Sequence, residues 1–176
     1  MPRSPALRLF VALSLVLAVA ACSRSNPISS INSAQTGGGG DEDGPIVPGT
    51  PREFATRVGD TVLFLTDSTT LTPEAQQILT TQAQWLNQYP QYRIIVEGHA
   101  DERGTREYNI ALGAQRAVST RHFLIGRGVE AQRIRTLSYG KERPVAVCPN
   151  ISCWSQNRRA VTVVENPGAV ANYAPR

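Results

Sequence analysis

The chain has 176 residues, of which 41% are hydrophobic and 18% are charged, and its formal net charge is +4. Arg3 and Arg8 supply two of the positive charges and lie in an N-terminal segment that we expect to be removed. The remaining positive excess is too small to indicate nucleic acid as a partner, and we expect none. The rest of the chain is long enough for one domain of roughly a hundred residues with its own core.

The N-terminus has the pattern of a secretory signal. Arg3 and Arg8 precede an apolar run from Leu9 to Val19, and small residues lead to Cys22. This run is shorter than the stretch of about 20 residues that a membrane-spanning helix needs. We therefore predict that residues 1–21 form a lipoprotein signal peptide. The alternative is an ordinary signal peptide that happens to precede a cysteine.

Val19 to Cys22 resembles a bacterial lipobox, in which the cysteine is lipidated and becomes the first residue of the mature chain. Ser23 stands where an aspartate would favour retention at the inner membrane. The resemblance thus implies lipidation of Cys22 and anchoring in the outer membrane, facing the periplasm. Several acyl chains would hold the protein firmly, since each buried methylene contributes about 0.8 kcal/mol.

The segment that follows Cys22 is rich in Ser, Asn, Gly and Pro. It contains the run Gly37 to Gly40 and the acidic cluster Asp41 to Asp43. Such a composition cannot bury a core, so we predict that residues 22–51 are the lipidated cysteine and a disordered linker. Fully extended, this linker reaches about 100 Å.

The first elements of the domain are expected in the order strand, helix. Val58 to Leu65 carries β-branched and aromatic residues and predicts a strand, followed by a polar loop from Thr66. Thr72 is a good N-cap and Pro73 suits the first helical position, which predicts a helix that runs to about Tyr89.

Further strands are predicted at Tyr92 to Gly98, Arg133 to Tyr139 and Arg159 to Val164, and a second helix at Arg106 to Gly126. The order β-α-β-α-β-β predicts an α/β fold of the α+β sandwich type, with a mixed sheet covered by helices on one side. We assign residues 52–166 to this domain and residues 167–176 to a flexible tail.

One segment, Gly98 to Ala117, carries the strongest chemical signal. It places Asp101 just after a strand and Arg116 one helix later. Asn109, Leu112 and Arg116 have the spacing i, i+3, i+7, which puts them on one side of that helix. An acid and an arginine together suit a ligand with both an ammonium and a carboxylate. The alternative is that Asp101 caps the helix or pairs with a nearby arginine.

Several motifs in the correct order resemble the OmpA-like peptidoglycan-binding domain, over nearly the whole folded region: Val96 to Thr105, Tyr108-Asn109, Leu112, Arg116-Ala117, Ser138 to Pro144 and Asn157 to Val161. The resemblance implies that Asp101 meets the ammonium, and Arg116 the carboxylate, of diaminopimelate in peptidoglycan. It also implies that N-H groups of the loop Thr66, Asp67 and Ser68 line the groove and that Arg158 approaches the ligand. Leu65 departs from the family pattern, which often has an acidic or small residue there.

The lipid-anchored members of this family bind peptidoglycan noncovalently and tether the outer membrane to the cell wall. Resemblance to them implies partnership with TolB and other proteins of the Tol-Pal system, in envelope integrity and in constriction of the outer membrane during cell division. Two other interpretations stay open: an OmpA-like adaptor of another envelope machine, and a cell-wall hydrolase.

Nothing in the sequence indicates catalysis, a metal site or a cofactor. His99 precedes Asp101, but the chain has only one other histidine, His122, and neither an HExxH nor a GxSxG motif. Cys148 and Cys153 remain after Cys22 is lipidated, and in an oxidising compartment we expect them to form a disulfide rather than two free thiols.

Overall fold

The computed structural model describes residues 45–166. The predicted signal peptide, the lipidation site Cys22, the linker up to residue 44 and the tail 167–176 lie outside the described residues. Within residues 45–166, no helix combines the length and the apolar composition needed to cross a bilayer.

A mixed four-stranded sheet forms the centre of the domain, in the order β1-β4-β2-β3. Its strands are β1 (Thr61–Leu63), β2 (Arg93–His99), β3 (Ile134–Gly140) and β4 (Arg159–Glu165). β4 lies between β1 and β2 and is antiparallel to both, whereas β2 and β3 are parallel. The predicted mixed sheet is confirmed.

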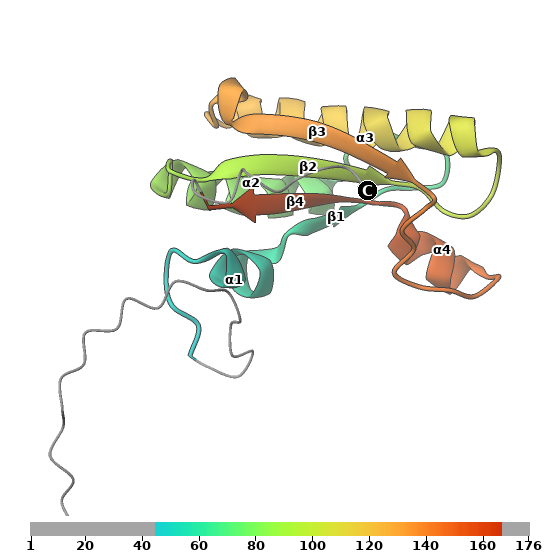
Figure 1. The fold of residues 1–176 in the computed structure, drawn as a ribbon, viewed down its shortest axis with the longest axis horizontal. Helices are drawn as coiled ribbons and strands as arrows, with labels where there is room; N and C mark the ends of the chain where they lie inside the picture. Colours follow the sequence, from blue (N-terminus) through green and yellow to red (C-terminus); the bar gives the residue numbers. More distant parts are fainter. Residues whose placement is uncertain (1–44, 167–176) are drawn as a thin grey trace, which may run out of the picture. The chain divides into compact units, whose positions relative to one another are not determined.

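Two long helices, α2 (Pro73–Gln88) and α3 (Arg106–Gly126), cover the same face of this sheet (Figure 1). Each begins at a threonine N-cap: the side-chain oxygen of Thr72 accepts a hydrogen bond from the Ala75 N-H, and that of Thr105 from the Tyr108 N-H. Both helices end within one residue of the prediction, and the helices on one side are confirmed.

The strand predicted from Val58 to Leu65 is present, but it is much shorter than predicted. The chain forms a short helix α1 (Pro51–Glu53) and a π-helix η1 (Phe54–Gly59), and β1 covers only Thr61–Leu63. Gly59 has a φ of +84°, which ends η1 and turns the chain into the sheet. The β-branched Val58 packs against the core from the helical turn, so tertiary packing overrides its strand propensity.

Two further short elements were not predicted. A 3₁₀ turn η2 (Ala131–Arg133) leads into β3, and helix α4 (Ile151–Asn157) lies in the connection between β3 and β4. Figure 1 shows α4 at the end of the sheet where β2 and β3 finish.

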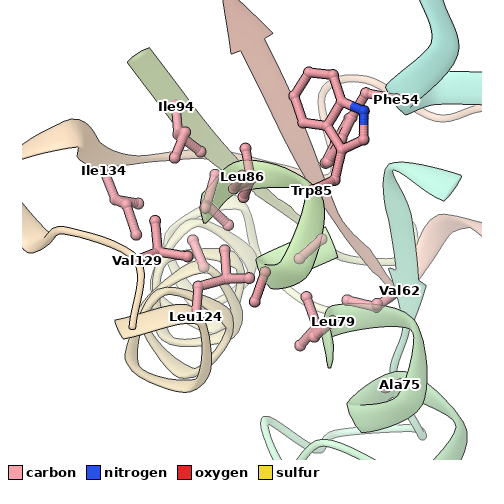
Figure 2. Packing of buried hydrophobic residues seen from close by; sticks show 14 of the residues in the cluster. Phe54, Val62, Ala75, Leu79, Trp85, Leu86, Ile94, Leu124, Val129 and Ile134 are labelled. Carbon is pink, nitrogen blue, oxygen red and sulfur yellow. The ribbon is translucent and has the colours of Figure 1, made fainter. Parts of the chain in front are cut away.

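The core lies between the sheet and the two long helices. Leu79 and Leu86 of α2 and Leu124 of α3 meet Val62 and Ile94 of the sheet, all with almost no solvent exposure (Figure 2). At one end Trp85 packs against Phe54, with ring centroids 5.0 Å apart, and its indole N-H donates to Glu53 at 2.9 Å. The hydroxyl of Tyr92 donates to the Gly49 carbonyl at 2.6 Å, so the contacts of the domain extend upstream to Gly49.

A pair of glycines lets α3 lie directly on the backbone of β2. A Cβ added at Gly98 would lie 1.8 Å from the Gly113 carbonyl oxygen, and one at Gly113 would lie 2.8 Å from the Gly98 carbonyl oxygen. This close approach sets the side of α3 that carries Asn109 and Arg116 against the end of β2, where Asp101 follows.

Candidate functional site

A pocket of about 310 Å³ lies where β2 ends, between the start of α3 and the loop after β1. Six of the eight residues predicted to bind ligand line it, together with three that were not predicted; the full set is Thr66, Asp67, Asp101, Arg103, Gly104, Tyr108, Asn109, Leu112 and Arg116. The other two predicted residues contact this set. The Ser68 carbonyl accepts a hydrogen bond from Arg116, and Arg158 donates to Asp101.

Arg116 is completely buried, with 0% of its surface exposed. Its guanidinium donates to the carbonyl oxygens of His99 at 2.8 Å, Ser68 at 2.9 Å and Leu65 at 3.2 Å. Burial, and then the nearby charge of Arg158, lowers the pKa of Arg116 to about 10, while nearby carboxylates raise it. Arg116 therefore keeps its positive charge at neutral pH.

Asp101 is 8% exposed and accepts four hydrogen bonds. Arg103 donates its backbone N-H at 3.2 Å, Nε at 3.0 Å and Nη2 at 2.7 Å, and Arg158 donates Nη1 at 3.2 Å. Burial raises the pKa of Asp101, but the bonds from Arg103 and Arg158 outweigh it, so the pKa lies below the usual aspartate value. The alternative prediction, a pairing with a nearby arginine, is confirmed, and the same carboxylate also lines the pocket.

The loop after β1 presents carbonyl groups to the site. The carbonyls of Leu65 and Ser68 point at Arg116, whereas the Ser68 N-H bonds back to Leu65 at 3.3 Å, so the N-H groups expected to line the groove are not all free for a ligand. Asp67 has a φ of 56° and accepts a hydrogen bond from the Tyr108 hydroxyl. Leu65 is 64% exposed, so it serves the site through its backbone and not through its side chain.

Asn109 holds the loop that carries Asp101, which we call the Asp101 loop (residues 100–105). Its side-chain amide donates to the carbonyls of Arg103 at 2.7 Å and Thr105 at 3.0 Å. Leu112, one turn further along α3, supplies an apolar wall. The i, i+3, i+7 spacing correctly placed Asn109, Leu112 and Arg116 on the pocket side of α3.

Comparison with known proteins decides the family. The family model described as "OmpA family" matches residues 63–158, which is more than half of the chain. The chain belongs to the OmpA family. The matched segment runs from the last residue of β1 to the residue directly before β4, so it contains every residue that lines the pocket.

The curated relatives of this OmpA domain are named peptidoglycan-associated lipoproteins, and the chain belongs to that group. The one from Agrobacterium fabrum is 54% identical over 94% of this chain and 90% of its own. The one from Rhizobium meliloti is 54% identical over 90% of this chain and 88% of its own. The crystal structure of the Burkholderia pseudomallei protein of that name superposes with a TM-score of 0.62 at 38% identity, covering 66% of this chain and all of that one.

Three pocket residues of the OmpA domain were missed by sequence reasoning: Arg103, Gly104 and Tyr108. Arg103 and Gly104 stand inside the motif that was singled out, so their position next to Asp101 was the available signal. Gly104 has a φ of +84°, and a Cβ there would lie 3.5 Å from the Tyr108 ring. The glycine thus closes the Asp101 loop over the start of α3.

His99 lies on the opposite face of the sheet from the pocket. It is 1% exposed, its ring stacks on Tyr139 at 5.5 Å, and Nε2 is 3.7 Å from the Glu97 carboxylate. Only its carbonyl, through Arg116, belongs to the site. In the described part of the OmpA domain, no group of three or more His, Cys, Asp or Glu side chains is placed to hold a metal ion.

Cys148 and Cys153 form the predicted disulfide, with Cα atoms 5.6 Å apart. The bridge spans the start of α4, in the connection between β3 and β4. The prediction of a disulfide over two free thiols is confirmed.

Proposed function

We propose that this protein is an outer-membrane lipoprotein, anchored through Cys22, that binds peptidoglycan noncovalently through diaminopimelate and so tethers the outer membrane to the cell wall. The observation that supports it best is the pocket, which is lined by both a buried carboxylate, Asp101, and a buried guanidinium, Arg116. The relatives' name, peptidoglycan-associated lipoprotein, supports the polymer as ligand.

Arg116 binds the carboxylate of the ligand, and Asp101 binds its ammonium. An arginine has five N-H donors, and three of those of Arg116 have carbonyl partners, which leaves donors for a ligand carboxylate. The ligand ammonium meets Asp101. That carboxylate already accepts four hydrogen bonds, about its full capacity, so the ammonium takes the place of a bond from Arg103, the more exposed of its two arginine partners.

Selectivity follows from the pairing. A ligand without an ammonium cannot replace Arg103 at Asp101, and one without a carboxylate cannot use the remaining donors of Arg116, so a side chain with one charge or none forfeits one of the two contacts. The polymer repeats its ligand and many lipoproteins share one membrane, so modest affinity at each site gives durable attachment. The function needs no covalent step, and we propose no catalytic role.

Membership of the peptidoglycan-associated lipoproteins also supports a place in the Tol-Pal system, with TolB as a protein partner. In this system the tether contributes to envelope integrity and to constriction of the outer membrane at division.

The test is a pull-down with purified sacculi, using the full chain in mild detergent, the isosteric variant Asp101→Asn, and Arg116→Lys, each checked for folding by circular dichroism. The parent should bind, free diaminopimelate should compete, and both variants should bind at least tenfold more weakly, as expected for an ion pair worth about 1.4 kcal/mol or more. Leu65→Ala, which changes an exposed side chain beside the pocket, should bind like the parent.

Two results would contradict the proposal. If Asp101→Asn and Arg116→Lys bind like the parent, the pocket is not the site. If soluble fragments are released from the sacculi, the protein is a hydrolase.

A further inference from the structure

The connection between β3 and β4, residues 141–158, holds the Asp101 loop from outside the pocket. Lys141 donates to the carbonyls of Gly104 at 2.7 Å and Glu102 at 3.3 Å. Trp154 donates its indole N-H to the Glu102 carboxylate at 2.9 Å, and Arg158 donates to Asp101 at 3.2 Å. The Asp101 loop is therefore braced by a segment that itself does not line the pocket.

Two devices make this segment rigid. The disulfide between Cys148 and Cys153 closes the turn before α4, and the Asn150 side chain caps the helix by accepting the Ser152 N-H at 3.0 Å. At the last residue of the helix, the Asn157 side chain accepts hydrogen bonds from the N-H groups of Val145 and Ala146 and donates to the Ala146 carbonyl at 2.8 Å. Helix α4 is thus tied at both ends, and Trp154 stands in the middle of it.

The ring of Trp154 faces the side chain that pairs with Asp101. The Arg103 guanidinium carbon lies 4.4 Å from the centre of the Trp154 ring, within cation-π distance. The same guanidinium donates two hydrogen bonds to Asp101. Arg103 is therefore held from two sides, and its side chain is still 41% exposed.

From this arrangement we propose that Trp154 is a positioning residue for the ligand site. Its ring holds Arg103 at the pocket when a ligand ammonium displaces Arg103 from Asp101. The turn closed by the disulfide keeps Trp154 in place. Because Arg103 lines the same pocket as Arg116, it can then act together with Arg116 on the ligand carboxylate. A flexible arginine would have to be ordered on binding, and an aromatic platform removes that entropic cost. This inference rests on the proposed function.

The test compares Trp154→Leu, which keeps apolar bulk without an aromatic face, with Trp154→Phe, which keeps a face but loses the bond to Glu102. Affinity for free diaminopimelate is measured by calorimetry on the full chain. Trp154→Leu should lose about two- to fivefold, the size of a cation-π contact at a partly exposed site, and Trp154→Phe should stay within about twofold of the parent. The double variant Cys148→Ser/Cys153→Ser should lose affinity as Trp154→Leu does. Ile151→Ala, an exposed change on the same helix, should have no effect.

A second measurement works without ligand: titration of the Asp101 carboxyl by NMR. Looser placement of Arg103 should raise the measured pKa of Asp101 in Trp154→Leu and leave it unchanged in Trp154→Phe. If the parent binds no diaminopimelate but this pattern holds, the proposed function fails and the positioning stands. If Trp154→Leu matches the parent in both measurements, the role assigned to the ring is overturned. The same holds if Trp154→Leu and Trp154→Phe lose affinity for diaminopimelate equally.

Discussion

Arg116 holds two segments of the pocket together and is also the proposed partner of the ligand carboxylate. Its three hydrogen bonds reach carbonyls that lie on two separate segments, the loop after β1 and the end of β2. A buried carbonyl left without a donor costs about 1–3 kcal/mol, so the residue stabilises the pocket walls even when no ligand is present. This is why Arg116→Lys, which keeps a charge and a donor, is a better test of binding than truncation.

His99 makes the stability of the domain depend on pH. Burial lowers its pKa, the neighbouring Glu97 raises it, and the charges of Arg159 and Arg143 lower it further, with a net pKa below the ordinary value. The unfolded chain therefore takes up a proton at about pH 6.5, before the folded protein does, so stability falls as the pH decreases through and below that value.

We expect the free energy of unfolding in urea to decrease between pH 7.5 and pH 5, and the decrease to be smaller in His99→Gln. Asp101, whose pKa is also lowered, acts in the same direction but only in the more acidic range below about pH 4, so it does not disturb this window. An equal pH dependence in the variant would show that another group is responsible.

At the scale of elements, the contact between α3 and β2 sets the geometry of the site. We expect Gly113→Ala to be destabilised by about 1–3 kcal/mol or more, because the added methyl meets the Gly98 carbonyl and the Ser138 hydroxyl oxygen, which would lie 2.5 Å away. Chemical denaturation measures the loss. Ligand binding should weaken too, since α3 carries Arg116.

Gly126→Ala is the matched control on the same helix. A Cβ there meets nothing within 4 Å, so the change should be neutral or stabilising by up to about 1 kcal/mol through helix propensity. Equal losses at the two glycines would refute the close-approach argument.

The long helices α2 and α3 could be predicted from the sequence, whereas the helical turn before β1 and the short helix α4 could not. Thr72 and Thr105 cap helices whose apolar residues repeat with helical spacing, so local sequence and tertiary structure agree. The segment before β1 has strand-like residues, but packing of Phe54 against Trp85 favours a helical turn. Helix α4 has seven residues and depends on a disulfide and the Asn157 bonds, which no periodicity reveals.

At the scale of the whole molecule, the candidate site joins segments far apart in sequence. Arg116 bonds to residues 48 and 51 positions away, and Arg158 to one 57 positions away. The motifs identified the participating segments, and the resemblance named the acid and the base. The sequence left open whether Asp101 pairs with an arginine. It could not show that Arg103 is that partner, because the path of the Asp101 loop is set by hydrogen bonds from Asn109, Lys141 and Trp154.

The proposed tether separates into an anchor and a binding domain. We expect Cys22→Ser to leave the membrane fraction and appear among soluble periplasmic proteins, while it still sediments with sacculi in the pull-down. Cell fractionation measures the first effect, and the pull-down measures the second. Retention of Cys22→Ser in the outer membrane would mean that another part of the chain holds the protein there.

The four hydrogen bonds on Asp101 have a consequence for a growing cell. In the binding mode proposed above, Arg103 returns to the Asp101 carboxylate when the ligand departs, so the empty site leaves no buried charge without a partner. Release of one stem peptide then replaces the ligand ammonium at Asp101 by Arg103 and leaves no unpaired carboxylate. A lipoprotein built this way can move from strand to strand as the wall is remodelled, remaining folded at every step.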